Sequence, residues 1–149
     1  MSNKLLNLQI QNITIENTNY SNINYLMFLL LNNIEDKFII KLIKNGALIT
    51  DDFIYEVIKT NKYKLFKKLV DFIDVNNTLF INGEYKNLLE IIICLDSRER
   101  FLKHIINHGF EIIPYNYDLG FIKNCINDCY NSKKSYTKIL NKNGVVFNN

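Results

Sequence analysis

The sequence predicts an all-α solenoid of about four helical hairpins with a short β-like cap at the N-terminus. Three observations favour that class. Apolar residues recur at helical spacing, in paired runs separated by short polar turns. A glycine turn recurs at Gly46, Gly109 and Gly144, at intervals of 63 and 35 positions, which fit two periods and one period of a stacked helical repeat. Glycine and proline number only 5 and 1 among 149 residues, too few for a turn-rich β-sandwich or barrel.

The composition bounds the class of protein further. Hydrophobic residues make up 48% and charged residues 22% of the chain, as in folded domains and not in disordered segments. No apolar run approaches the roughly 20 residues of a membrane helix, and the N-terminus lacks the apolar core of a signal peptide. The 3 cysteines have no disulfide-framework spacing, which is typical of reduced thiols. We therefore expect a cytoplasmic protein that has no membrane partner.

Residues 1–23 differ from the rest of the chain. Apolar and polar residues alternate from Leu6 to Ile15, and a period of two with β-branched residues predicts a strand or hairpin. A polar linker follows it. Because the end unit of a stacked array needs a polar outer face, we expect this segment to act as a cap. The chain therefore divides into a cap and linker over residues 1–23 and a helical repeat domain over residues 24–149.

The first two helical hairpins follow from their stripes and turn residues. Helices are expected over residues 25–31 and 34–44, and Gly46 supplies the left-handed residue that ends the second of them. Thr50, followed by two aspartates, is N-capping chemistry for the next helix. Ile73 stands where the second hairpin should have its glycine, so that turn must close by another geometry. The stripes of the second hairpin are Phe53, Ile54, Val57 and Ile58, then Leu65, Phe66, Leu69 and Val70.

A β-turn signal precedes the third helical hairpin. Asn82-Gly83, flanked by apolar residues, predicts a tight β-hairpin. Helices are then expected over residues 87–95 and 98–107, with a cap at Asp96-Ser97 between them. The apolar stripe of the later helix is Phe101, Leu102, Ile105 and Ile106.

The fourth helical hairpin follows an extended segment. Pro114 bars a helix shortly after Gly109. Beyond it, helices are expected over residues 121–130 and 135–141, joined by a longer polar loop. Little chain remains after Gly144 for another unit.

The second helices and their closing turns resemble the ankyrin repeat. The matching stretches are Phe38-Ile39-Ile40-Lys41-Leu42-Ile43-Lys44-Asn45-Gly46-Ala47, Leu65-Phe66-Lys67-Lys68-Leu69-Val70 with Asp74-Val75-Asn76 after it, and Phe101-Leu102-Lys103-His104-Ile105-Ile106-Asn107-His108-Gly109. The resemblance covers residues 24–149, although no copy keeps the Thr-Pro-Leu-His box of the first helix. It is greatest to the divergent repeats of AT-rich large DNA viruses and some intracellular microbes. It implies a degenerate ankyrin-like array that binds and modulates a host or cellular protein, in the host cytoplasm if the chain is viral.

Five aromatic residues are the candidate protein-binding residues. In ankyrin-like arrays the inter-repeat loops and first helices form a concave binding face, so the resemblance implies that aromatic residues there contact a partner. Surface aromatic residues are favoured anchors of interfaces. An alternative is that they cover the ends of the core between repeats. The candidates are Tyr55 on a first helix, and Phe80, Tyr85, Tyr115 and Tyr117 in or beside loops.

A basic cluster provides an alternative function in nucleic-acid binding. Basic side chains interleaved with an aromatic residue can bind a nucleic acid, although such a run is more often the solvated face of a helix. A net charge of +3 does not by itself indicate a nucleic-acid partner. We therefore rank a protein partner first, and we expect a monomer or a weak homo-oligomer. The cluster consists of Lys59, Lys62, Lys64, Lys67 and Lys68.

The sequence shows no pattern of a catalytic or metal centre. Glycine-rich phosphate loops and nucleophile motifs are absent, so we expect no enzymatic activity and no cofactor. His104 and His108 are four residues apart, as are Cys125 and Cys129, which is a spacing that zinc sites use. We interpret Cys94 and Cys125 as small core residues and His108 as a helix-end residue. The expectation is therefore no metal.

Overall fold

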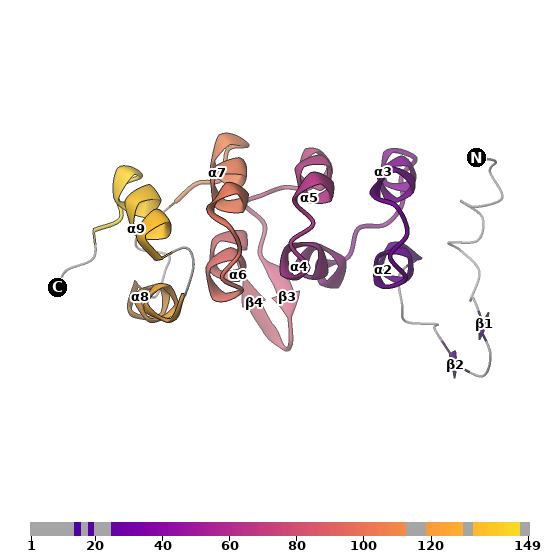
Figure 1. Cartoon of the computed structure of the whole chain (residues 1–149), viewed down its shortest axis with the longest axis horizontal. Coiled ribbons are helices and arrows are strands. Elements are labelled where there is room, and N and C mark those ends of the chain that lie inside the picture. The colour runs from indigo at the N-terminus through magenta and orange to yellow at the C-terminus, as the bar shows by residue number, and fades with distance from the viewer. Residues whose placement is uncertain (1–13, 16–17, 20–24, 113–118, 130–132, 147–149) are drawn as a thin grey trace.

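In the computed structural model, the described part of the chain forms four pairs of helices that lie in a row (Figure 1). The structure describes residues 14–15, 18–19, 25–112, 119–129 and 133–146. Each pair consists of two contacting helices, and helices of neighbouring pairs also pack on one another, as α3 does on α5 and α5 on α7. The mainly helical class that the sequence predicts is confirmed.

The helix bounds agree closely with the sequence. Each of the six ranges predicted for the first, third and fourth pairs agrees with the structure within two residues at both ends. The short 3₁₀ helix η1 (Val70–Phe72) continues the second pair. The helices are α2 (Tyr25–Leu31), α3 (Asp36–Lys44), α4 (Asp51–Lys59), α5 (Tyr63–Leu69), α6 (Leu88–Cys94), α7 (Glu99–Asn107), α8 (Leu119–Asp128) and α9 (Lys133–Lys142).

Two short antiparallel sheets complete the described part of the chain. β1 (Thr14–Ile15) pairs with β2 (Thr18–Asn19). β1 lies at the end of the alternating segment predicted as a strand or hairpin, most of which is outside the described residues, whereas β2 lies in the stretch predicted as a linker. β3 (Leu79–Ile81) pairs with β4 (Glu84–Lys86) between the second and third helical pairs, as Asn82-Gly83 predicts. None of the described helices has the length and apolar character needed to cross a membrane.

The predicted glycine turns close three of the four second helices. Gly46, Gly109 and Gly144 each have φ +88°, a conformation in which a side chain would be strained. In each turn the following N–H donates back to a carbonyl five residues earlier, as Phe110 does to Ile105 at 3.0 Å. This is the hydrogen-bonding pattern of a Schellman motif.

The first helices end in the same way without glycine. Asn33, Asn61 and Asp96 have φ between 48° and 57°, and short Asn and Asp side chains tolerate this region better than other residues do. The expected cap at Asp96-Ser97 is therefore wrong. Asp96 and the Ser97 N–H close α6, and the N-cap of α7 is Arg98, which makes no side-chain capping bond.

The second helical pair closes without a left-handed residue. After α5 the chain tightens into η1 and leaves it at Ile73 in extended conformation, with φ −124° and ψ 157°. Asp74 Oδ1 then accepts the Asn76 N–H at 2.9 Å. The Asn76 side chain reaches the third pair, where Nδ2 donates to Gly109 O at 3.0 Å and Oδ1 accepts from the Glu111 N–H at 2.8 Å. One exposed amide thus joins the turns of two neighbouring pairs.

The core runs along the row between the helices. All eight stripe residues predicted for the second pair are buried, as are Phe101, Leu102 and Ile105 of the third, whereas Ile106 is half-buried. The fourth pair is attached to the end of α6, because the buried Tyr136 hydroxyl donates to Ile92 O at 3.4 Å.

Candidate functional site

The β3–β4 hairpin projects from the row of helices beside α4 and α6 (Figure 1). Its turn, Asn82-Gly83, has φ 51° and 83°, and two positive values are typical of a type I′ turn, which matches the twist of the flanking strands. Leu79 and Ile81 point into the core with 5% and 2% of their surface exposed. The alternation along β3 therefore leaves Phe80 facing solvent.

Phe80 and Tyr85 form an exposed aromatic pair on this hairpin. They lie directly opposite each other in the register, with ring centroids 4.9 Å apart and planes tilted by 52°. Phe80 is 50% exposed and Tyr85 is 73% exposed. Cross-strand aromatic contacts of this kind hold both rings in place, so the hairpin presents a preorganised apolar surface to solvent.

Asp51 fixes the hairpin to the helical array. Its Oδ2 accepts the backbone N–H of Phe80 at 2.9 Å, and Asp51 is the first residue of α4. Since this N–H points away from β4, Phe80 and Tyr85 are a pair whose backbones do not hydrogen-bond each other, in which the side chains approach more closely. The carboxylate at the start of α4 also lies where the helix dipole favours negative charge.

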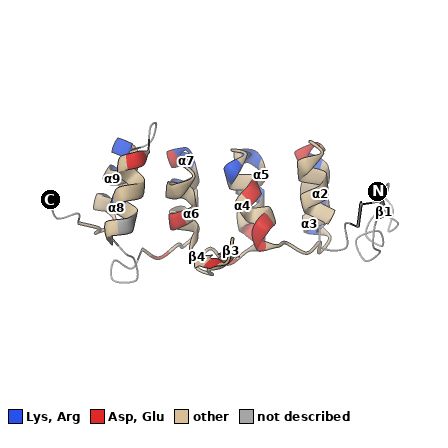
Figure 2. Cartoon of the chain, turned by 90° about the horizontal axis from the view of Figure 1, so that it is seen from below, with Lys and Arg blue, Asp and Glu red and all other residues tan. Residues whose placement is uncertain are grey.

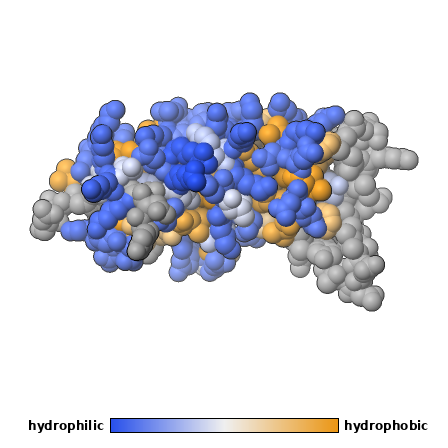
Figure 3. Space-filling model, viewed as in Figure 1, coloured by the Kyte–Doolittle hydropathy of each residue, from blue (hydrophilic) through white to orange (hydrophobic). Residues whose placement is uncertain are grey.

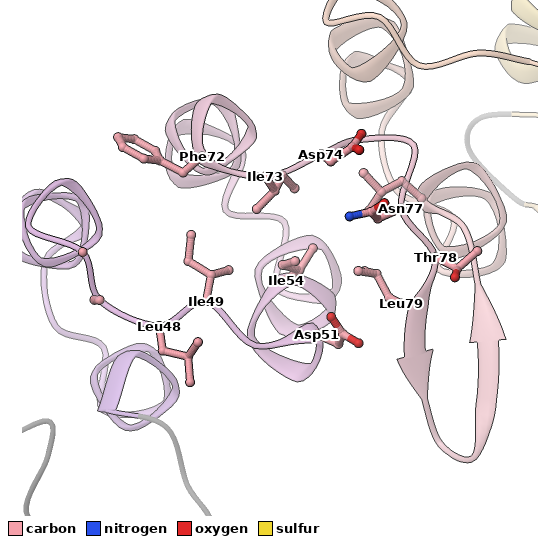
Figure 4. A pocket seen from close by; sticks show the side chains of 13 residues that line it. Leu48, Ile49, Asp51, Ile54, Phe72, Ile73, Asp74, Asn77, Thr78 and Leu79 are labelled. Carbon is pink, nitrogen blue, oxygen red and sulfur yellow. The ribbon is translucent and has the colours of Figure 1, made fainter.

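A cavity of about 480 Å³ adjoins the base of the hairpin (Figure 4). Asp51, Ile54 and Leu79 form the side next to the hairpin, and the loop after α3 and the end of η1 form the opposite side. Leu48 and Phe72 are 72% and 45% exposed there, so apolar side chains border the opening. The candidate site therefore combines a projecting aromatic pair with a cavity beside it.

Most of the face shown in Figure 3 is hydrophilic, and its hydrophobic areas are separate from one another, with an extended one towards the α2–α3 end. Near the hairpin the exposed charged groups are mainly acidic. Asp52 and Asp74 are exposed. Glu84 is also exposed, and its Oε2 lies 3.3 Å from Lys86 Nζ. In Figure 2 acidic residues colour the start of α4 beside the hairpin.

The charges of the helices are divided between the first and the second members of the pairs. In the second helices (α3, α5, α7 and α9), basic residues outnumber acidic ones by twelve to two, with three, three, two and four basic residues respectively. In the first helices (α2, α4, α6 and α8), five acidic residues face two basic ones. The hairpin thus lies with the acidic row.

The structure brings together some of the aromatic residues expected to bind a partner and not others. Phe80 and Tyr85 meet on the hairpin. Tyr55 is half-buried and packs against the core, so it offers less surface than the hairpin pair. Tyr115 and Tyr117 lie outside the described residues. The carboxylates around the hairpin and the cavity were not foreseen, because their positions depend on how β3 packs on α4.

The expected basic cluster is spread over two helices and their connection. Lys64, Lys67 and Lys68 are exposed on α5, and Lys67 Nζ lies 5.8 Å from the centre of the Tyr63 ring. Lys59 is at the end of α4. Lys62 is half-buried and its Nζ lies 3.6 Å from Asp36 Oδ1. Three lysines on α5 therefore remain together as an exposed basic surface.

The histidines belong to a packed cluster between α5 and α7. The ring of His104 lies 6.0 Å from Tyr63 and 6.1 Å from Phe66, and 4.1 Å from His108. Burial and the neighbouring His108 lower the pKa of His104. The described residues contain no group of three or more His, Cys, Asp or Glu side chains suited to a metal ion.

The cysteines differ from the expected core positions. Cys129 is buried, but Cys125 is half-buried and Cys94 is exposed at the last position of α6. The interpretation of Cys94 as a core residue is therefore wrong, because the stripe of α6 is formed by the preceding leucines and isoleucines. Burial, followed by the effect of its neighbours, raises the pKa of Cys129 to about 12.

Comparisons with family models, with curated proteins and with solved structures found no match to this chain.

Proposed function

We propose that the chain is a non-catalytic protein-binding module, of the ankyrin-like kind, that modulates a host or cellular protein. The observation that carries the proposal is the exposed Phe80–Tyr85 pair, held by a tight turn, a cross-strand contact and the bond to Asp51. Large aromatic side chains that are already ordered lose little conformational entropy on binding. They are therefore efficient anchors for a partner.

The surroundings of the pair suggest the chemistry of the partner. An apolar side chain of the partner contacts the two rings, and a second one enters the cavity bordered by Leu48 and Phe72. Basic residues next to those anchors complement the carboxylates of Asp52, Asp74 and Glu84. The partner segment is therefore expected to mix apolar and basic residues.

A phage-displayed library of random peptides tests this function. Peptides enriched on the wild-type chain are synthesised, and their dissociation constants are measured with Phe80→Ala/Tyr85→Ala and with Val146→Ala. Val146 is a matched control because it is 70% exposed and follows α9. We expect the double variant to weaken binding at least about tenfold and the control to change it less than about twofold.

Two outcomes would refute the proposal. One is a set of enriched peptides that bind the double variant as tightly as the wild type. The other is an equal loss with the Val146→Ala control, which would mean that exposed apolar residues bind peptides without selectivity. Basic residues should be enriched among the selected peptides, and raising the salt concentration should weaken their binding.

Nucleic-acid binding is a second candidate, favoured by the charge of the second helices. Twelve basic residues against two acidic ones in α3, α5, α7 and α9 give this row a strongly positive character. Binding to a single-stranded oligonucleotide would then fall steeply with salt. Replacing Lys64, Lys67 and Lys68 with Gln should lower the slope by up to about two to three. No binding at low salt eliminates this candidate.

A further inference from the structure

Two thiols from neighbouring helical pairs meet at the surface of the protein. Cys94 is the last residue of α6, and Cys125 lies in α8, 31 residues later. Their Sγ atoms are 3.2 Å apart, and α6 packs directly on α8. The two sulfurs need to approach by about 1.2 Å to reach the length of a disulfide bond.

Solvent reaches this pair, unlike the third cysteine. Cys94 is exposed and Cys125 is half-buried, whereas Cys129 is buried and its Sγ points at the carbonyl oxygens of Ile93 and Cys125, at 3.4 Å and 3.1 Å. A small oxidant can therefore contact the Cys94–Cys125 pair while Cys129 is protected. The chain thus contains its own control thiol.

We propose that Cys94 and Cys125 are a redox modification site that forms a reversible disulfide and fastens the fourth helical pair to the third. The oxidant is a small disulfide such as glutathione disulfide. One cysteine thiolate attacks a sulfur of glutathione disulfide, forming a mixed disulfide and releasing one glutathione thiolate. The second cysteine thiolate then attacks the protein sulfur, forming the Cys94–Cys125 bond and releasing the other glutathione. Two cysteine thiols lose two electrons and two protons, and one glutathione disulfide becomes two glutathione thiols.

The environment of Cys94 favours this residue as the thiol that attacks second, on the mixed disulfide. Although part of its side chain is exposed, the burial of the rest of this residue raises its pKa to about 12, and the hydrogen bond and charge of Cys125 contribute in the same direction. Once the Cys125 sulfur is bound to glutathione, it is neither a hydrogen-bonding thiol nor a charged thiolate. Its two contributions to the raised pKa of Cys94 are then lost. Cys94 is then the resolving thiol, placed next to the sulfur that it must attack.

The disulfide has a structural consequence at the fourth pair. α8 and α9 are joined to the rest of the row through α6 and α7, and the bond would close a loop of chain that includes the whole of α7. Closing that loop restricts the unfolded state. We therefore expect the unfolding midpoint of the oxidised protein to rise by about 5–10 °C.

Intact-mass analysis after equilibration in glutathione buffers tests the proposal. The wild type is held in an oxidising and in a reducing glutathione buffer, and free thiols are then alkylated. We expect two of the three thiols to be lost in the oxidising buffer, with no glutathione retained, and to return in the reducing buffer. Peptide mapping without reduction should find Cys94 joined to Cys125.

Serine variants separate this pair from chance oxidation. Cys129→Ser should form the disulfide and show the same rise in midpoint. Cys94→Ser and Cys125→Ser should show neither, and the remaining thiol should retain glutathione. Three free thiols in the wild type under both conditions would overturn the proposal. So would wild-type protein that retains as much glutathione as the Cys94→Ser and Cys125→Ser variants, or a disulfide bond to Cys129. The wild-type measurements decide the matter even if a variant fails to fold, and they are independent of any binding partner.

Discussion

Replacing Asn76 with alanine should weaken the connection between the second and third helical pairs. The Asn76 side chain makes two hydrogen bonds to backbone atoms 33 and 35 residues away, at 3.0 Å and 2.8 Å. A hydrogen bond contributes a net 0.5–1.5 kcal/mol on average, and exposed bonds lie at the lower end because water replaces them. The expected loss is therefore about 1–2 kcal/mol in the free energy of unfolding.

Urea denaturation followed by circular dichroism measures this loss by linear extrapolation. Asn77→Ala is the matched control, since Asn77 is also exposed and its backbone N–H bond to Asp74 is retained. Asn76→Asp is a second variant that keeps the acceptor for the Glu111 N–H and places a carboxylate against Gly109 O. Asn76→Asp should therefore lower the free energy of unfolding at least as much as Asn76→Ala does.

A difference below about 0.3 kcal/mol between Asn76→Ala and Asn77→Ala would refute this reasoning. It would mean that helix packing alone holds the two pairs together. A loss well above about 3 kcal/mol would also contradict it, because two exposed hydrogen bonds cannot account for that much.

Two further predictions concern pH and the fourth pair. Because the pKa of His104 is lowered from 6.5 by burial and His108, the unfolded chain binds a proton more readily than the folded one. The free energy of unfolding should then fall as the pH drops through about 6.5 and level off above it, and His104→Gln should flatten this dependence in urea titrations at several pH values. Tyr136 is fully buried and its hydroxyl bonds to Ile92 O, so Tyr136→Phe should cost about 1 kcal/mol and Tyr136→Ala about 3–5 kcal/mol by thermal or urea unfolding. Equal losses for the two Tyr136 variants would contradict the assignment of that ring to the core.

The helices could be predicted from the sequence because each signal is local. Apolar stripes at helical spacing and the glycines at positions 46, 109 and 144 fix where helices run and end. The left-handed residues that close the first helices were missed, because Asn33 and Asn61 are common polar residues in an Asn-rich chain. No local sequence pattern marks the positive φ values of these two residues, 54° and 57°.

The candidate site could be predicted only in part, because it depends on contacts distant in sequence. Asn82-Gly83 indicates a hairpin, and its flanking aromatic residues follow from strand alternation. That Asp51 holds Phe80 across 29 residues does not follow from any local pattern. The same holds for Cys94 and Cys125, which are brought together by the packing of α6 on α8.

The hairpin coincides with the break in regularity of the array. The left-handed residues that close the first helices are 28 positions apart from Asn33 to Asn61, and 35 apart from Asn61 to Asp96. The additional chain of the longer interval is about the length of the β3–β4 hairpin. Leu79 and Ile81 of the hairpin are buried against the helices, but Phe80 and Tyr85 are large aromatic side chains left in solvent at a cost in hydration free energy. Residues that depart from the local rules of a fold without stabilising it are those most readily explained by binding, so we give the hairpin priority over α5 as the surface that a partner contacts.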